Sequence, residues 1–402
     1  MPGLLTGPAD VEWVRCETAS LPCAVDVPAA WEPRWLEVLV DARGFLSRVG
    51  AWPAFERPLL VVTGAPVHAL TVPDAAPFLG AGYQTRPAVL LADDVWPDVD
   101  VVVHELTHAW LQRVAGAGPR WVVKAGVAST ERAAVHEAVA DFLAAVHRGG
   151  PMVGRASTPE PLEARTLTEV RRCPEDWSGS AHDDAQVVSS ALWALRGVVP
   201  SDEVVAAVVV AAPRSETVRG FSSAMREALS AAARPAWARL VEAQGLERCD
   251  QPIRVTASAP ASATVDRFWL PGVGDVDAGA TVAAPQAFVL SGRSLQEVTV
   301  SLQATQPLSL DVTAGASHFR VDLAGGARPA ARFTLESPVD EVQVRVVSAN
   351  RGPAAYNDVV MAGAAAPASA AGPLVAMLVG LLVVLGLAGW RARRSSSRAH
   401  RT

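Results

Sequence analysis

The order of hydrophobic and polar positions divides the chain into stretches with different expected secondary structure. The first runs from residue 10 to about residue 95 and contains an amphipathic helical pattern at 31–50. Two short apolar runs, at 57–66 and 86–94, are bounded by turn residues. Such runs are typical of strands. We therefore expect short strands and one helix in this part of the chain.

The middle stretch, residues 98–250, is predicted to be mainly helical. Apolar residues recur there with the 3.6-residue period of a helix, and proline, glycine and polar breaks separate the periodic segments. The predicted helices cover 99–115, 130–147, 182–197, 201–212, 215–232 and 235–244.

After Cys249 the pattern changes from a helical period to an alternation of apolar and polar residues. Turn residues separate five alternating runs, which predicts a small antiparallel β-sandwich of about 100 residues. The runs are 297–303, 308–312, 318–323, 332–336 and 341–347.

The end of the chain predicts a membrane anchor. An Ala/Pro/Ser linker at 362–372 precedes 373–390, and no charged residue occurs from Ala362 to Trp390. That uncharged length approaches the ~20 residues of a transmembrane helix. The tail, 391–402, contains five arginines and is expected to be cytoplasmic by the positive-inside rule. This topology places the large N-terminal part outside the cell membrane, and we expect an export signal upstream of Met1.

Composition limits the classes of function. Half of the 402 residues are hydrophobic and 19% are charged, which indicates two or three globular domains. A net charge of −6, with no basic stripe before the tail, argues against a nucleic-acid-binding protein.

The four cysteines form no CxxC pair, so a cysteine-type zinc ribbon is not expected. Their even number permits two disulfides, for example Cys16–Cys23 with Cys173–Cys249. Sequence does not choose among the three possible pairings, and four free thiols are the other interpretation.

The segment "HELTH" holds His104, Glu105 and His108 in a helical pattern. Residues four apart lie on one face of a helix, so both imidazoles can bind one zinc ion. Glu105 follows the first histidine and can act as a general base for water.

A catalytic zinc ion needs a third protein ligand. Glu137 and Asp141 are also four residues apart, on the next predicted helix. Glu137 is the favoured third ligand, and Asp141 can accept the outer N–H of a ligand histidine. His136 is the rival ligand, but it points about 100° away from Glu137 and leaves Asp141 without a role.

"HELTH" followed by "EAVAD" resembles the gluzincin metallopeptidases, the thermolysin and fungalysin-like group, over about residues 85–200. The resemblance implies a zincin-like fold and a zinc cofactor. It also implies zinc ligands at His104, His108 and Glu137, a general base at Glu105 and an orienting role for Asp141.

The expected fold class is therefore α+β. A zincin-like catalytic domain with a mainly helical C-terminal half is followed by an antiparallel β-sandwich and one C-terminal transmembrane helix. The predicted boundaries are 10–250 for the metallopeptidase domain, 251–361 for the sandwich, 362–372 for the linker, 373–390 for the helix and 391–402 for the tail.

Two further roles follow from the same resemblance. His182, before a predicted helix, is similar to the family histidine that hydrogen-bonds the oxyanion; the alternative is a helix-start histidine without function. In the family, an edge strand before the active-site helix binds the substrate backbone, and 87–92 is the candidate here.

These observations predict a membrane-anchored zinc endopeptidase acting on peptide or protein substrates. One alternative is a non-catalytic surface binding or adhesion protein on a metallopeptidase fold. Another is a zinc hydrolase of a non-peptide amide or ester. No nucleic-acid partner is expected.

Overall fold

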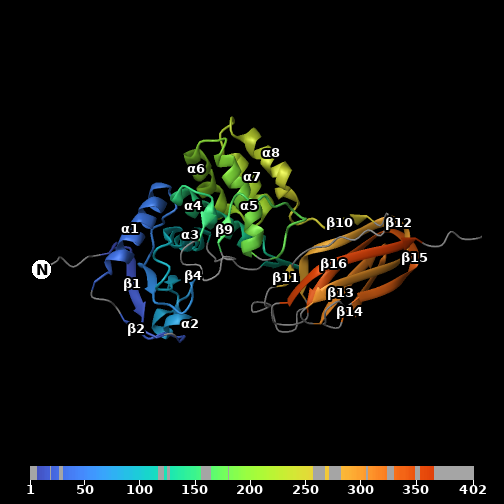
Figure 1. Ribbon diagram of the computed structural model, residues 1–402, viewed down its shortest axis with the longest axis horizontal. Helices are drawn as coiled ribbons and strands as arrows, with labels where there is room; N and C mark the ends of the chain where they lie inside the picture. The colour runs from blue at the N-terminus through green and yellow to red at the C-terminus, as the bar shows by residue number, and fades with distance from the viewer. Residues whose placement is uncertain are drawn as a thin grey trace, which may run out of the picture.

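The molecule is known from a computed structural model (Figure 1). The residues that it describes are 7–18, 20–26, 30–115, 122–124, 127–154, 164–179, 181–256, 268–270, 282–304, 307–323, 330–348 and 354–365.

The N-terminal part is a five-stranded mixed sheet with the strand order β2-β1-β3-β5-β4. The three central strands β1, β3 and β5 are parallel, and β2 and β4 pair antiparallel at the two edges. The strands are β1 (Val11–Cys16), β2 (Val25–Asp26), β3 (Leu59–Thr63), β4 (Ala69–Val72) and β5 (Ala88–Leu91).

Both faces of this sheet are covered, which explains why β3 and β5 are apolar at nearly every position. Leu59 and Val61 face one hydrophobic core, shared with α1 (Pro33–Arg48) and α3 (Val99–Ala115). Leu60 and Val62 face a second core, to which the short helix α2 (Ala76–Leu79) contributes. The sheet therefore holds α3, the helix that carries "HELTH".

Six helices dominate the region from 99 to 244. They are α3, α4 (Glu131–Arg148), α5 (Ala181–Arg196), α6 (Ser201–Ala211), α7 (Val218–Ala228) and α8 (Arg234–Gln244). Helix α4 packs against both α3 and α5 and ends at Gly149, whose φ of 73° is a left-handed cap. Four short strands lie between helices: β6 (Val122–Lys124), β7 (Val127–Ser129), β8 (Met152–Val153) and β9 (Arg165–Thr166).

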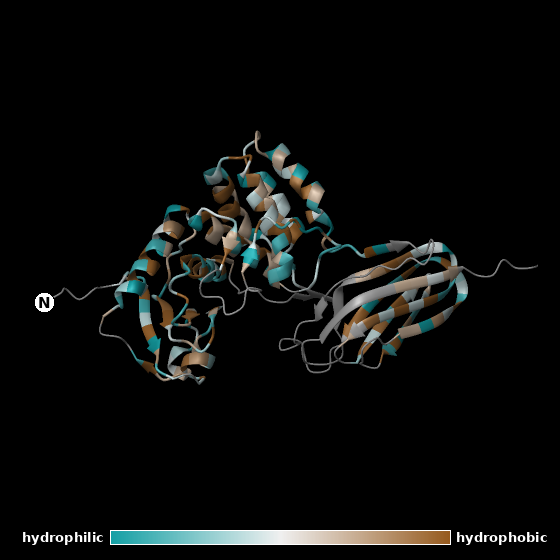
Figure 2. Cartoon of the chain, in the orientation of Figure 1, coloured by the Kyte–Doolittle hydropathy of each residue, from teal (hydrophilic) through white to brown (hydrophobic). Residues whose placement is uncertain are grey.

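The C-terminal part is a β domain built around two long strands, β12 (Val282–Ala304) and β15 (Ala330–Ser348). Hydrophobic and hydrophilic residues alternate along its strands, and the hydrophobic ones form a core of their own (Figure 2). The other strands are β10 (Ile253–Thr256), β11 (Phe268–Leu270), β13 (Leu308–Ala314), β14 (Ser317–Leu323) and β16 (Ala354–Ala365).

The predicted fold class needs correction in this β domain. Its sheet is not purely antiparallel, because β10 pairs parallel with β12, and β7 from the helical region also pairs parallel with β12. The runs 332–336 and 341–347, predicted as two strands, are one strand, β15, with a register shift opposite 291–297. Residues 362–365 of the predicted linker belong to β16.

The predicted membrane anchor also needs correction. Among the residues that the structure describes, no helix is long and apolar enough to cross a membrane. The predicted span 373–390 and tail 391–402 lie outside those residues. The transmembrane helix of the predicted fold class and the single-pass location in a cell membrane are therefore not supported by the described residues.

Two disulfides join the four cysteines. Cys16–Cys23 links β1 to the segment before β2, and Cys173–Cys249 joins residues 76 positions apart. The second bond fastens the loop before α5 to the segment after α8, where the helical region ends.

Candidate metal centre

Helix α3 places two histidines and a glutamate on its inner side, away from solvent. The exposed fraction is 4% for His104, 7% for Glu105 and 5% for His108. The helix is surrounded by the N-terminal sheet, α1 and α4, so even its polar residues are enclosed. Buried polar groups cost free energy unless a partner satisfies them, so this cluster calls for a ligand.

Helix α4 brings Glu137 to the two histidines, and three ligand atoms form a nearly equilateral triangle. His104 Nε2 lies 3.0 Å from His108 Nε2 and 3.2 Å from Glu137 Oε2. The third edge, from His108 Nε2 to Glu137 Oε2, is 3.3 Å. All three residues are buried. This group could hold a metal ion.

The triangle has the size that a tetrahedral ion requires. Ligand atoms about 2.0–2.1 Å from such an ion lie about 3.3 Å from one another. The donors, two imidazole nitrogens and one carboxylate oxygen, are of the kinds that zinc and other first-row divalent metals accept. The geometry leaves a fourth position without a protein ligand among these three residues.

Asp141 holds the first histidine in the orientation that metal binding needs. Its Oδ1 lies 2.9 Å from His104 Nδ1, so the Nδ1–H donates to Asp141 and Nε2 faces the triangle. Asp141 is fully buried, and Arg165 donates to both of its oxygens, from Nε at 2.8 Å and Nη2 at 2.7 Å. Arg165 therefore fixes the carboxylate that fixes His104.

The charges of this cluster are strongly coupled. Burial raises the pKa of Glu137, but the neighbouring His108 and His182 outweigh it and hold that pKa well below its usual range. Burial disfavours the charged form of His104 as well, but Asp141 and Glu137 raise its pKa to about 10. The site thus attracts positive charge, as a cation site must.

Glu105 does not belong to the triangle and has its own fixed position. The hydroxyl of Thr71 lies 2.6 Å from Glu105 Oε2 and 2.8 Å from the Glu105 carbonyl oxygen, so it shares its proton between two acceptors. Thr71 belongs to β4, and its own carbonyl accepts a longer contact of 3.4 Å from Gln112. The edge strand is thereby fastened to α3 beside Glu105.

His182 reaches the same centre from the start of α5. Its Nδ1 lies 3.0 Å from Glu137 Oε2, and its side chain is 58% exposed. The attraction of Glu137 raises the pKa of His182. His182 lines the same cavity as His104 and Glu105.

The structure settles where the rival candidates lie. His136 is buried but is not part of the triangle, and burial together with His108 lowers its pKa to about 3. The segment 87–92 cannot be an edge strand, because β5 lies between β3 and β4. The edge strand beside the site is β4, whose position in the sheet the sequence pattern did not specify.

Three residues at the site have no local sequence pattern that predicts them. They are His68, Thr71 and Arg165, and they come from the segment before β4, from β4 and from the two-residue strand β9. His68 and Arg165 line a cavity of about 260 Å³ together with His104, Glu105 and His182.

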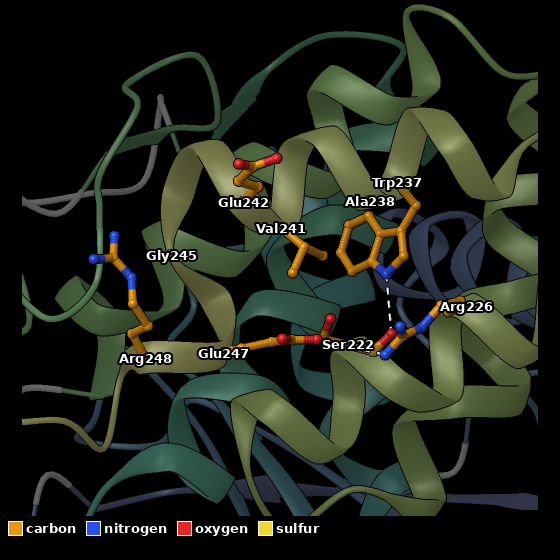
Figure 3. A pocket seen from close by; sticks show the side chains of 9 residues that line it. All are labelled: Ser222, Arg226, Trp237, Ala238, Val241, Glu242, Gly245, Glu247 and Arg248. Carbon is orange, nitrogen blue, oxygen red and sulfur yellow. Dashed lines mark hydrogen bonds and ion pairs between the residues drawn. The ribbon is translucent and has the colours of Figure 1, made fainter.

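A second cavity, of about 550 Å³, lies between α7 and α8 (Figure 3). Trp237 forms one wall and donates from Nε1 to the Ser222 carbonyl at 3.0 Å. Its charged residues are two arginines and two glutamates, and it contains neither histidine nor cysteine. It therefore lacks the combination of ligands found between α3 and α4.

Comparison with known proteins assigns no family. No protein-family model and no curated protein matches the chain. Three solved structures illustrate the partial likenesses, each with a TM-score near 0.2. The pre-peptidase C-terminal domain of collagenase from Bacillus anthracis is 14% identical, with 28% of this chain and 97% of that chain covered and a TM-score of 0.21.

The other two have the same low level of similarity. CsCBM6-3 from Clostridium stercorarium in complex with cellobiose is 12% identical. The match covers 29% of this chain and 98% of that chain, with a TM-score of 0.18. PliG of Aeromonas hydrophila, a periplasmic inhibitor of g-type lysozyme, is 16% identical. The match covers 28% of this chain and 98% of that chain, with a TM-score of 0.18. Likenesses of this size carry no conclusion about activity.

Proposed function

We propose that this chain is a zinc-dependent endopeptidase that cleaves peptide bonds with water. One observation carries the proposal: three buried ligand atoms lie 3.0–3.3 Å from one another, and one of the three ligand residues, His104, lines the same cavity as the separately held Glu105. A metal site with an open position and a base beside it is the minimum that zinc-dependent hydrolysis requires. The gluzincin resemblance of "HELTH" and "EAVAD" supports the same function.

His104, His108 and Glu137 would hold the ion, and Asp141 would keep His104 in the correct tautomer. When bound, zinc would polarise the carbonyl of the substrate and increase the acidity of water. Glu105 would accept the proton of the attacking water and pass it to the leaving amine. The hydrogen bond from Thr71 occupies Oε2, which leaves Oε1 to do so.

The surroundings fit a peptide substrate. Strand β4 is the sheet edge beside the cavity, and Ala69 at its start lines that cavity. An extended peptide can add to such an edge through backbone hydrogen bonds. His182, whose pKa is raised by its proximity to Glu137, would donate a hydrogen bond to the developing oxyanion.

The test is hydrolysis of a mixed peptide library by the zinc-loaded full chain beside Glu105→Gln. That change retains the three ligands and removes the base, so we expect cleavage to fall by roughly 10²–10⁴-fold with unchanged zinc content. Absence of any cleavage by the wild type, with zinc bound, would refute the proposal. Equal cleavage by the two proteins would refute the role of Glu105.

A further inference from the structure

The cavity beside the metal centre is lined by both polar and apolar residues. Ala69, Val101 and Val153 supply apolar surface, and Arg165 and His68 supply nitrogen atoms. At about 260 Å³, the cavity has room for a single small side chain. The residues that line the cavity therefore help to determine which substrate side chain fits beside the cleaved bond.

Arg165 retains hydrogen-bonding capacity after it has bound Asp141. Nε and Nη2 donate to the two Asp141 oxygens, while Nη1 has no partner among the described residues. The Arg165 side chain is 19% exposed, and Asp141 is fully buried. The guanidinium is therefore held rigidly with one edge of N–H donors left for a ligand.

His68 supplies a second group without a partner. Its Nε2 is buried and has no hydrogen-bond partner in the part of the chain that the structure describes. A buried polar atom without a partner is unfavourable, and a ligand that hydrogen-bonds it removes that cost. His68 precedes the edge strand β4, where the proposed substrate would lie.

The N–H groups of Arg165, together with a histidine whose Nε2 can carry a proton, favour an acceptor with two oxygens and a negative charge. A carboxylate accepts from a guanidinium more strongly than a neutral carbonyl does, because both the charge and the two-oxygen geometry match. We propose that this cavity selects peptides carrying a carboxylate beside the cleaved bond, with Arg165 Nη1 and His68 Nε2 donating to it. This substrate class rests on the proposed peptidase function.

The carboxylate could belong to an aspartate or glutamate side chain or to the end of the peptide chain. The test uses quenched peptides that differ only in Asp against Asn, Glu against Gln, or a free against an amidated C-terminus. We expect kcat/KM to be roughly tenfold or more higher for the carboxylate member of at least one pair. The pair that discriminates identifies the source of the carboxylate.

A binding measurement separates this inference from the proposed activity. Calorimetry with zinc-loaded Glu105→Gln and the same peptide pairs should show tighter binding of the carboxylate member. His68→Ala should reduce the preference in both assays, and His318→Ala, on the exposed part of β14, should leave it unchanged. Arg165→Lys, which keeps a charge beside Asp141, should reduce it as well.

The outcomes are distinct. Cleavage without any preference for the carboxylate members would overturn the substrate class and leave the peptidase proposal standing. Selective binding without cleavage by the wild type would support the cavity and overturn the peptidase proposal. A preference that His68→Ala and Arg165→Lys both leave intact would overturn the assignment to this cavity.

Discussion

The helical region and the β domain bury different kinds of side chain. Between them, α3 and α4 enclose two histidines that belong to the metal triangle and two carboxylates, Glu137 and Asp141, that contact them. In the described part of the β domain, Ser309 is the one buried polar residue, and its hydroxyl contacts Asp322 and Arg320. The other buried residues described in this region are apolar.

This contrast identifies the site more securely than overall similarity does. Enclosing charged groups is unfavourable unless partners or a bound ion compensate. The chain concentrates that cost on two adjoining helices, which is typical of functional sites. The β domain follows the ordinary rule of an apolar interior, so we expect its substitutions to affect stability and not metal binding.

The largest effect is expected when a ligand of the triangle is removed. His108→Ala should weaken zinc binding by more than about a hundredfold, because even the loss of a residue behind a ligand costs about 10–100-fold. His318→Ala on β14 is the matched control. A competition titration with a chelator measures both affinities, and equal affinities would contradict the assignment.

In the β domain, Leu310→Ala should lower stability without weakening zinc binding. Leu310 is fully buried in the core of that domain. Its truncation is expected to lower the free energy of unfolding by about 2–5 kcal/mol and to leave zinc affinity unchanged. Urea denaturation of this variant, beside Thr313→Ala at an exposed position of β13, gives the stability change. Loss of zinc binding in Leu310→Ala would remove the contrast between the two regions.

Asp141→Asn tests the residue behind the first ligand. We expect the zinc affinity to fall by about 10–100-fold with the stoichiometry unchanged, since His104 loses the acceptor that fixes its tautomer. Glu131→Gln, in the first turn of the same helix, is the control. If the affinity of Asp141→Asn equals that of the control, the contact between His104 and Asp141 has no part in metal binding.

A further prediction concerns the dependence of stability on pH. Burial raises the pKa of Asp184 to about 7, even though Ser178, Gly179 and Thr130 donate hydrogen bonds to it. Between pH 4 and pH 7 the folded chain keeps a proton that the unfolded chain releases. The stability contributed by Asp184 is therefore complete below pH 4 and declines as pH rises to 7, by at most about 1.4 kcal/mol per pH unit.

Asp184→Asn should remove this part of the pH dependence. Urea unfolding of the chelator-treated protein at several pH values measures it, with Asp183→Asn as a control because that side chain is 45% exposed. Parallel pH profiles for wild type and Asp184→Asn would show that Asp184 does not retain its proton.

The sequence predicts those parts of the site whose residues lie close together along the chain. The pairs His104/His108 and Glu137/Asp141 are each four residues apart, so a helix alone places their members together. Thr71 and Arg165 come from short strands whose position depends on the order of the sheet and on loop geometry. No spacing in the sequence encodes those contacts.

The fold likewise has features that local sequence predicts and features that depend on contacts between distant segments. The six helices between 99 and 244 occur close to their predicted bounds, because each has a continuous helical period. The identity of the edge strand and the merging of two runs into β15 depend on which strands pair, which alternation does not reveal. The membrane anchor is predicted from an uncharged apolar stretch and a basic tail, both outside the described residues, and the described helices do not include a span.

The most direct test of the central claim is a metal analysis of the purified full chain. The protein is dialysed against an equimolar mixture of zinc, manganese, cobalt and nickel and then analysed by mass spectrometry, beside the double variant His104→Ala/His108→Ala. Our account predicts one zinc ion per wild-type chain and none at this site in the variant. A wild type without stoichiometric metal, or a variant that retains it, would contradict the account.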